Sequence, residues 1–244
     1  MRSIASFARE CRDASGMMEA PLVEARCLDK IFGSSPVLRG LDLRVIGGAG
    51  AMIIGRNGAG KSTLLRTLAG LTRPSAGEAL LFGRPSTDLP SNLRARIALV
   101  THQSFLYPTL SARENLEFVA ALYRVEDGRA DVDGWLDRVG LRAVADERVR
   151  TFSRGMEQRL ALARALLPQP DILLMDEPFA ALDGDGVALV IDLVREALAR
   201  CSAIVIAAHE PLALDGFSFY ELVRGRLARP VNELSRENLR PFGA

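Results

Sequence analysis

The chain has 244 residues, and its 31 Lys and Arg against 30 Asp and Glu leave a formal net charge of +1 at pH 7. A balance this close to zero argues against a global electrostatic attraction to nucleic acid or to an anionic membrane, so no nucleic-acid partner is expected. No apolar run approaches the roughly 18 to 20 residues of a membrane-spanning helix, so the chain is not expected to cross a bilayer alone.

The two ends of the chain are expected to lie outside the folded part. Residues 1–20 contain acidic side chains and no continuous apolar segment, which favours a flexible N-terminal extension over a secretory signal. Met17 or Met18 remains an alternative natural start. A single domain is expected over 21–228, followed by a C-terminal tail at 229–244.

The first part of the chain is expected to contain mostly strands. Alternating apolar and polar residues predict an antiparallel pair around a turn at 33–36. A short buried strand then leads through a glycine-rich loop into the apolar spacing of a helix. The predicted elements are strands at 22–28, 37–46, 51–55, 79–83 and 96–100, and a helix at 61–71.

The second part changes to amphipathic helical sequence and then alternates strands with helices. A helical subdomain is predicted at about 104–155, and a following helix at 155–170 ends at Pro168 and Pro170. Strands at 171–178, 202–210 and 217–228 and a helix at 186–201 complete the prediction. Continuous apolar strands alternating with helices indicate an α/β fold with a mainly parallel sheet covered on both faces.

The segment "GRNGAGKST" carries the most specific motif. Gly55, Gly60, Lys61 and Ser62 fit the P-loop pattern G-x-x-x-x-G-K-[ST], between a strand and a helix as the pattern requires. Backbone N–H groups of such a loop wrap around a β-phosphate, and the following helix dipole favours the anion. We therefore expect a nucleotide-binding loop formed by Gly55, Asn57, Gly58, Ala59, Gly60, Lys61, Ser62 and Thr63.

Two adjacent carboxylates follow the apolar run "ILLMDEP". Asp176 and Glu177 stand where a strand ends at the carboxyl edge of the sheet, which is the usual ligand-binding edge. Asp176 is expected to hold Mg²⁺ together with Ser62, and Glu177 to act as the general base that polarises water. A solvated turn is the alternative when the pair is taken without the P-loop.

Together with further motifs, these segments resemble the ATP-binding cassette (ABC) ATPases over residues 22–228. The signature motif of that family, usually LSGGQ-like, corresponds to "FSRGM" at 152–156. Its glutamine lid corresponds to Gln103, the loop after its acidic motif to "AALD" with Asp183, and its switch histidine to His209. Six motifs occur in the family's order.

The resemblance implies a P-loop NTPase core with a mainly parallel sheet, an antiparallel β subdomain and an inserted α-helical subdomain. It also implies an ATP-dependent homodimer, in which Ser153 and Gly155 of one copy close the site of the other. This chain departs from the usual motif at Arg154 and Met156, while Ser153 and Gly155 are retained.

The resemblance assigns three further residues to the site. Phe32 corresponds to the aromatic residue on which adenine stacks, with burial in the core as the alternative. Gln103 is implied to contact Mg²⁺ and to take part in catalysis, and His209 to orient the water and Glu177. The implied cofactors are ATP and Mg²⁺.

The implied function is that of an ATPase motor subunit of an ABC transporter, bound peripherally at the cytoplasmic side of the cell membrane beside a separate permease. The sequence "TFSRGMEQRLALARALL" resembles most the ATP-binding subunits of haem exporters of cytochrome c maturation. Another small-molecule, lipid or drug exporter is the alternative, and a soluble non-transport ABC ATPase is the remaining one.

Overall fold

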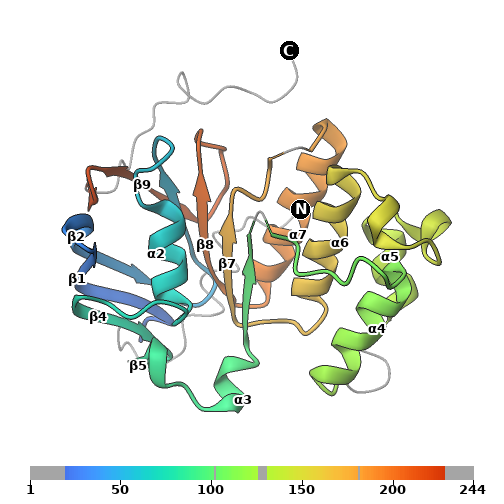
Figure 1. Cartoon of the computed structure of the whole chain (residues 1–244), viewed down its shortest axis with the longest axis horizontal. Helices are drawn as coiled ribbons and strands as arrows, with labels where there is room; N and C mark the ends of the chain where they lie inside the picture. Colours follow the sequence, from blue (N-terminus) through green and yellow to red (C-terminus); the bar gives the residue numbers. More distant parts are fainter. Residues whose placement is uncertain (1–19, 102, 126–130, 181, 229–244) are drawn as a thin grey trace.

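The computed structural model describes residues 20–101, 103–125, 131–180 and 182–228. Except for Ala20, the expected extension at 1–20 and tail at 229–244 lie outside the described residues. Figure 1 shows two β-sheets with helix α2 beside them at one end of the molecule and a group of helices at the other.

The smaller sheet is antiparallel and has the strand order β2-β1-β4-β5. Its two long strands alternate buried and exposed residues in part, because one face packs on the core. The antiparallel β subdomain is therefore confirmed, with strands longer than predicted and a turn of only Gly33 and Ser34. The strands are β1 (Val23–Phe32), β2 (Ser35–Val45), β4 (Ala76–Leu81) and β5 (Arg84–Pro85).

The larger sheet has the order β10-β9-β3-β8-β7-β6, and all its pairs are parallel except the β9–β10 hairpin. Every residue of β7 and β8 is buried, as continuous apolar strands in a covered parallel sheet require. The strands are β3 (Gly50–Ile54), β6 (Ile97–Val100), β7 (Ile172–Asp176), β8 (Ala203–Ala208), β9 (Phe217–Val223) and β10 (Arg226–Leu227).

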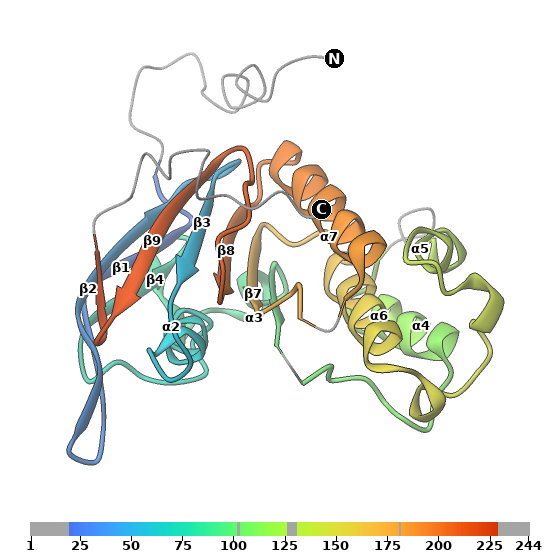
Figure 2. The ribbon, with the colours of Figure 1, turned by 90° about the horizontal axis from the view of Figure 1, so that it is seen from above.

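Helices cover both faces of this sheet (Figure 2). Helix α2 (Lys61–Leu68) packs on one face, together with the small sheet. Helices α6 (Arg154–Leu166) and α7 (Gly184–Ala199) pack on the other face. Successive residues of β7 alternate between the two cores, since Leu174 joins the first and Leu173 the second.

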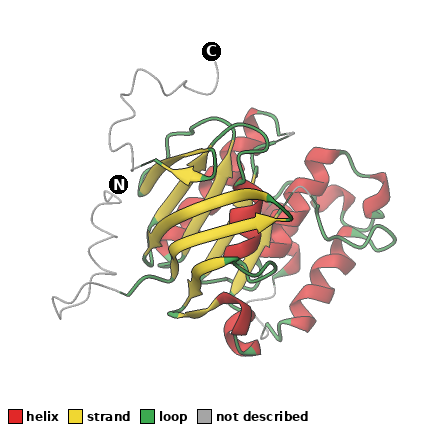
Figure 3. Cartoon of the chain, turned by 60° about the vertical axis from the view of Figure 1, so that its left-hand side comes forward, coloured by secondary structure: helices red, strands yellow, loops and turns green. Residues whose placement is uncertain are grey.

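The helical region after β6 contains α4 (Ala112–Leu122) and α5 (Val132–Arg138), and Figure 3 shows its helices standing apart from the strands. A reciprocal capping box between Ser111 and Glu114 begins α4. The predicted helical content is thus confirmed, while the boundaries at about 104–155 stay a prediction. The 3₁₀ turns η2 (Arg142–Val144) and η3 (Val149–Thr151) lie inside this predicted helical region. Short segments not expected from the sequence are α3 (Ser91–Arg94) and the 3₁₀ turn η1 (Ser86–Asp88).

Candidate nucleotide-binding site

The glycine-rich loop joins the end of β3 to the first turn of α2, as the sequence predicts. A Cβ atom at Gly55 would lie 2.9 Å from the carbonyl oxygen of Leu222, so a larger residue would not fit there. Gly60 caps α2 with φ of +109°, in the region that side chains rarely adopt, and a Cβ atom there would lie 3.1 Å from the Val37 carbonyl oxygen. The two glycines therefore let the loop close over the N-terminus of α2.

A cavity of about 320 Å³ opens at this loop. It brings together the residues of the P-loop with Phe32 and Glu177, although these come from three separate segments of the chain. Val37 and Arg56 also line it and were not expected. Arg56 stands inside the loop motif and could have been noticed, whereas Val37 carries no sequence signal. The lining consists of Phe32, Val37, Arg56, Asn57, Gly58, Ala59, Gly60, Lys61, Ser62, Thr63 and Glu177.

Lys61 is the buried cation of the cavity, with 5% of its side chain exposed. Its ammonium donates a 2.6 Å hydrogen bond to the Gly55 carbonyl oxygen and lies 3.3 Å from Glu177 Oε1. Burial of a lysine without such partners would be costly, so the loop backbone and the carboxylate together hold the charge in place. The site thus presents a fixed positive charge beside backbone donors.

Glu177 follows β7 directly and adopts φ of +54°, which is uncommon for a residue with a side chain. Its backbone N–H donates to the Ala207 carbonyl oxygen at 2.8 Å, which holds this conformation against the neighbouring strand. The turn directs the carboxylate towards Lys61 at the cavity. Such strained backbone is found disproportionately at functional sites.

Asp176 is buried at the last position of β7, with 5% exposure, and its Oδ1 atom has no hydrogen-bond partner. A buried carboxylate oxygen without a donor fits a cation ligand. Within the described ranges no group of three or more His, Cys, Asp or Glu side chains could hold a metal. Mg²⁺ is commonly held by one or two carboxylates with water and substrate phosphates. The Asp176 Oδ1 atom and the hydroxyl of Ser62, which lines the cavity, are oxygen donors of the type that it prefers.

Phe32 ends β1 with 52% of its surface exposed and lines the cavity, so it is not a core residue. The Lys30 ammonium lies 4.7 Å from the centre of its ring and donates a 2.8 Å hydrogen bond to the Arg73 carbonyl oxygen. An exposed ring at the rim of the loop cavity can offer a face to a flat base.

Gln103 and His209 lie at the same edge of the sheet but not in the cavity lining. Gln103 is exposed shortly after β6, where its backbone N–H donates to Thr101 Oγ1 at 3.1 Å. His209 is exposed directly after β8. Because β6, β7 and β8 are parallel neighbours, their carboxyl ends meet at one edge. Gln103 and His209 therefore follow strands on either side of β7, which ends at Asp176. Their expected roles in catalysis stay predictions.

The signature segment begins α6. Ser153 caps the helix by accepting a 3.3 Å hydrogen bond from the Met156 N–H, and Ser153 and Arg154 are both exposed. Gly155 is partly buried, and Met156 packs against the larger core. None of the four lines the cavity at the P-loop.

Asp183 caps α7 in the same manner as Ser153 caps α6. Its Oδ1 atom accepts a 2.8 Å hydrogen bond from the Gly186 N–H, and the residue itself is exposed. The structure thus shows a capping role for Asp183, and its part in a dimer loop stays a prediction.

Comparison with known proteins identifies the family. Residues 38–180 match the model of the ABC transporter family. The chain is 35% identical to cytochrome c biogenesis ATP-binding export protein CcmA of Idiomarina loihiensis over 201 residues, 82% of this chain and 90% of that protein. It is 37% identical to Nod factor export ATP-binding protein I of Paraburkholderia xenovorans, over 79% of this chain and 64% of that protein.

A solved structure agrees with these matches. The dimeric ATP-binding cassette in a post-hydrolysis state with ADP and Pi has a TM-score of 0.73 and 27% identity, covering 90% of this chain and all of that one. In the part of the chain that the structure describes, no helix has the length and apolarity needed to span a membrane. The chain belongs to the ABC transporter family, as an ATP-binding subunit with ATPase activity.

Proposed function

We propose that the chain is the ATP-driven motor of an exporter, working as a homodimer beside a membrane permease at the cytoplasmic face of the membrane. The observation that carries this proposal is the cavity that unites the P-loop, Phe32 and Glu177. The domain that does this work would span 21–228.

Each side chain of the cavity has a defined task in this proposal. Lys61 binds the β- and γ-phosphates, and the loop N–H groups, including those from Asn57 to Thr63, surround them. Phe32 stacks on adenine. Mg²⁺, when bound through Ser62, Asp176 and Gln103, supplies charge neutralisation at the phosphates. Glu177 accepts a proton from the attacking water, and His209 orients that water.

The Lys61 ammonium lies 3.3 Å from Glu177 Oε1, so the attraction between the two charges keeps both side chains at the cavity. Phosphate oxygens compete with Glu177 for the Lys61 ammonium, because both are anions. When the Lys61 ammonium pairs with the phosphates instead of Glu177, the Glu177 carboxylate is free to accept a proton. The short distance between Lys61 and Glu177 therefore supports a coupling in which nucleotide binding releases the general base.

The site is proposed to be completed by a second copy. Ser153 is exposed at the N-terminus of a long helix and does not line the P-loop cavity of its own chain. Ser153 and Gly155 of one subunit would therefore contact the γ-phosphate held by the other, with Asp183 near the dimer contact. Arg154 and Met156 would flank that contact. The dimeric relative with bound ADP and Pi supports this arrangement.

Haem is the proposed cargo of the transporter. CcmA relatives are 35 to 39% identical to this chain, which supports a haem exporter of cytochrome c biogenesis. Nod factor export proteins at 36 to 37% identity support the alternative of another small-molecule or lipid exporter. Loss of the gene should therefore remove covalent haem from c-type cytochromes on haem-stained gels. Normal cytochromes would favour the alternative cargo.

Ser153→Arg tests the composite site. The variant should keep the ATP affinity of the parent, since its own P-loop is intact, and should lose phosphate release at high protein concentration. Thr151→Arg is the matched control, because Thr151 is also exposed just before α6. Parental turnover in Ser153→Arg would contradict a signature that acts across the dimer.

A further inference from the structure

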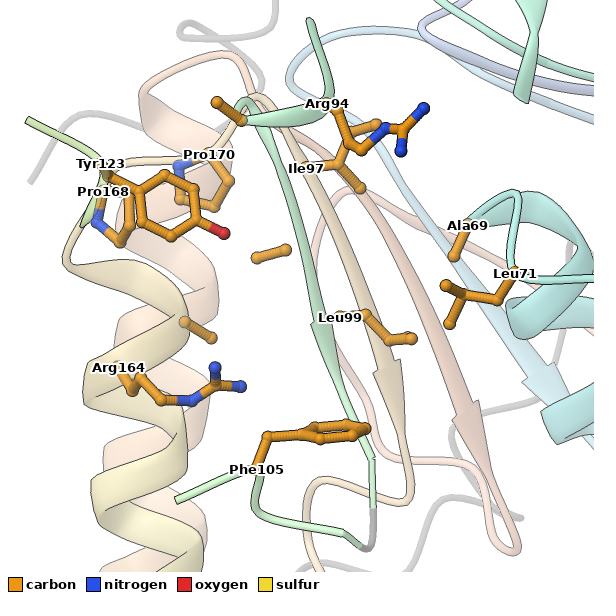
Figure 4. Close-up of a pocket in the computed structure, with 13 residues that line it drawn as sticks. Ala69, Leu71, Arg94, Ile97, Leu99, Phe105, Tyr123, Arg164, Pro168 and Pro170 are labelled. Atoms are coloured by element: carbon orange, nitrogen blue, oxygen red, sulfur yellow. The ribbon is translucent and has the colours of Figure 1, made fainter. Parts of the chain in front are cut away.

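Four cationic side chains of the described residues lie over an aromatic ring. Three of these cations are arginines, and none of their rings lines the nucleotide cavity. Figure 4 shows one of them, Arg164 with Phe105, at a separate pocket of about 270 Å³ beside α6. The fourth cation is Lys30, and its ring, Phe32, does line the nucleotide cavity. Of the four cations, Lys30 is therefore the one that can influence a bound nucleotide through its ring.

Two contacts fix the Lys30 ammonium in place. It lies 4.7 Å from the centre of the Phe32 ring and donates a 2.8 Å hydrogen bond to the Arg73 carbonyl oxygen. Within residues 20–101, 103–125, 131–180 and 182–228, Lys30 forms no ion pair with a carboxylate. Its charge is therefore shared between a carbonyl oxygen and the negative face of the ring.

The end of β1 that carries this pair is fastened to the segment 73–75, which leads from α2 to β4. Besides the Lys30 bond, the Ile31 N–H donates to Ser75 Oγ at 3.0 Å, and the Ser75 N–H donates to the Asp29 carbonyl oxygen at 2.8 Å. Helix α2 begins at the P-loop. The position of the aromatic ring is thus set relative to the helix whose N-terminus faces the phosphates.

The ammonium occupies one face of the Phe32 ring and leaves the other face to a base. The Phe32 side chain is 52% exposed, and an exposed side chain loses rotamer freedom when a ligand immobilises it. A contact that holds the ring before the nucleotide arrives reduces this loss. The positive charge also offsets part of the repulsion between the negative faces of two stacked rings.

We propose that Lys30 is a positioning residue for adenine, whose ammonium holds the Phe32 ring in the stacking orientation and directs the base to the opposite face. The inference rests on the proposed stacking of adenine on Phe32, and the role of Lys30 is the new element. Lys30 does not line the cavity, so it acts through the ring. Lys30 and Lys61 are the only two lysines of the chain, and the proposal places one at each end of the same nucleotide.

A double-mutant cycle in titration calorimetry tests this role on the full chain. Lys30→Met keeps most of the side-chain length and removes the charge and the donor. It should weaken ATP binding about 2- to 5-fold, the size of an exposed cation–π contact, and leave the affinity for inorganic triphosphate unchanged. In a Phe32→Ala background the same substitution should not change ATP affinity, because the ring that transmits its effect is gone.

Matched variants separate positioning from a structural effect. Lys30→Arg should restore most of the ATP affinity, since a guanidinium can also lie over the ring and donate a hydrogen bond. Arg84→Met removes an exposed cation from β5 of the same sheet and should match the parent. Lys30→Met should raise the KM for ATP and leave kcat unchanged, and its unfolding midpoint in urea reports on folding.

Selective ¹³C labelling of lysine observes the contact itself, because only two lysines contribute signals. The Hε protons of Lys30 should resonate upfield of their position in the Phe32→Leu variant, since they lie over the face of the ring. Addition of ADP should keep this upfield shift, because the base takes the opposite face. The Lys61 signal is the internal reference for the comparison of the two nucleotide-free proteins.

Several results would overturn the proposal. Equal losses of ATP affinity with and without the Phe32 ring, or equal losses for ATP and triphosphate, would show that Lys30 does not act through the ring. Parental ATP affinity in a folded Lys30→Met protein, or a Lys30 signal without the upfield shift, would remove the role. Loss of the shift with ADP would show that the base displaces the ammonium. A failure of the proposed stacking is distinguishable, because Phe32→Ala itself would then bind ATP as tightly as the parent.

Discussion

Replacing Lys61 by methionine should separate nucleotide binding from folding. The side chain is 5% exposed, and its ammonium contacts the Gly55 carbonyl oxygen at 2.6 Å, Glu177 Oε1 at 3.3 Å and, more weakly, the Arg56 carbonyl oxygen at 3.5 Å. Methionine has nearly the same length and no charge, so it keeps the packing and removes these interactions. Any bond of the ammonium to a bound phosphate is removed with them.

The substitution should change the free energy of unfolding and the free energy of ATP binding by different amounts. Loss of the bond to Gly55 costs about 0.5 to 1.5 kcal/mol of folding stability, and the ion pair to the partly exposed Glu177 adds at most about 1 kcal/mol. Removing a buried charge offsets part of this cost. A charge-assisted bond to phosphate is worth about 1.5 to 3 kcal/mol, so ATP affinity should fall by about 10- to 150-fold for each bond lost.

Isothermal titration with ATP and urea unfolding of the same preparations measure the two quantities. Arg66→Met is the control, because it removes an exposed cation from the last turn of the same helix. It should leave both the affinity and the unfolding midpoint close to those of the parent. Parental ATP affinity in a folded Lys61→Met protein would refute the role given to this side chain.

Two further predictions follow from individual contacts. Phe32→Ala should weaken ATP binding by about 1 to 3 kcal/mol while leaving the affinity for inorganic triphosphate unchanged, since the ring can act only on the base; equal losses for both ligands in titration calorimetry would contradict stacking. Asn115→Ala should lower the free energy of unfolding by about 2 to 4 kcal/mol in urea, because the buried amide makes three hydrogen bonds to the backbone of Tyr107 and Ser111. A loss below about 0.5 kcal/mol would show that water replaces these bonds.

The sequence predicts the central sheet well because its strands are buried on both faces. Continuous apolar runs at β7 and β8 leave no other stable placement, and the P-loop motif locates the helix that follows β3. No local sequence pattern predicts the spatial order of the strands. That order depends on which strands pair with each other after the crossover connections between them.

Contacts between distant segments are likewise missing from local patterns. Val37 meets the cavity only because the β1–β2 hairpin folds over Gly60. Arg164 has the spacing of an ordinary helix residue, and only the packing of α6 beside β6 reveals its buried Nε atom. The carboxyl-edge placement of Asp176 and Glu177 was predictable, whereas the backbone conformation of Glu177 was not.

The central claim is that two chains complete each nucleotide site, and sedimentation of the Glu177→Gln protein tests it most directly. With ATP and Mg²⁺ this variant should form a dimer that is absent without nucleotide, because the bound nucleotide is not hydrolysed. The double variant Glu177→Gln with Ser153→Arg should stay monomeric while still binding ATP. A monomer in the first case, or an unchanged dimer in the second, would contradict the claim.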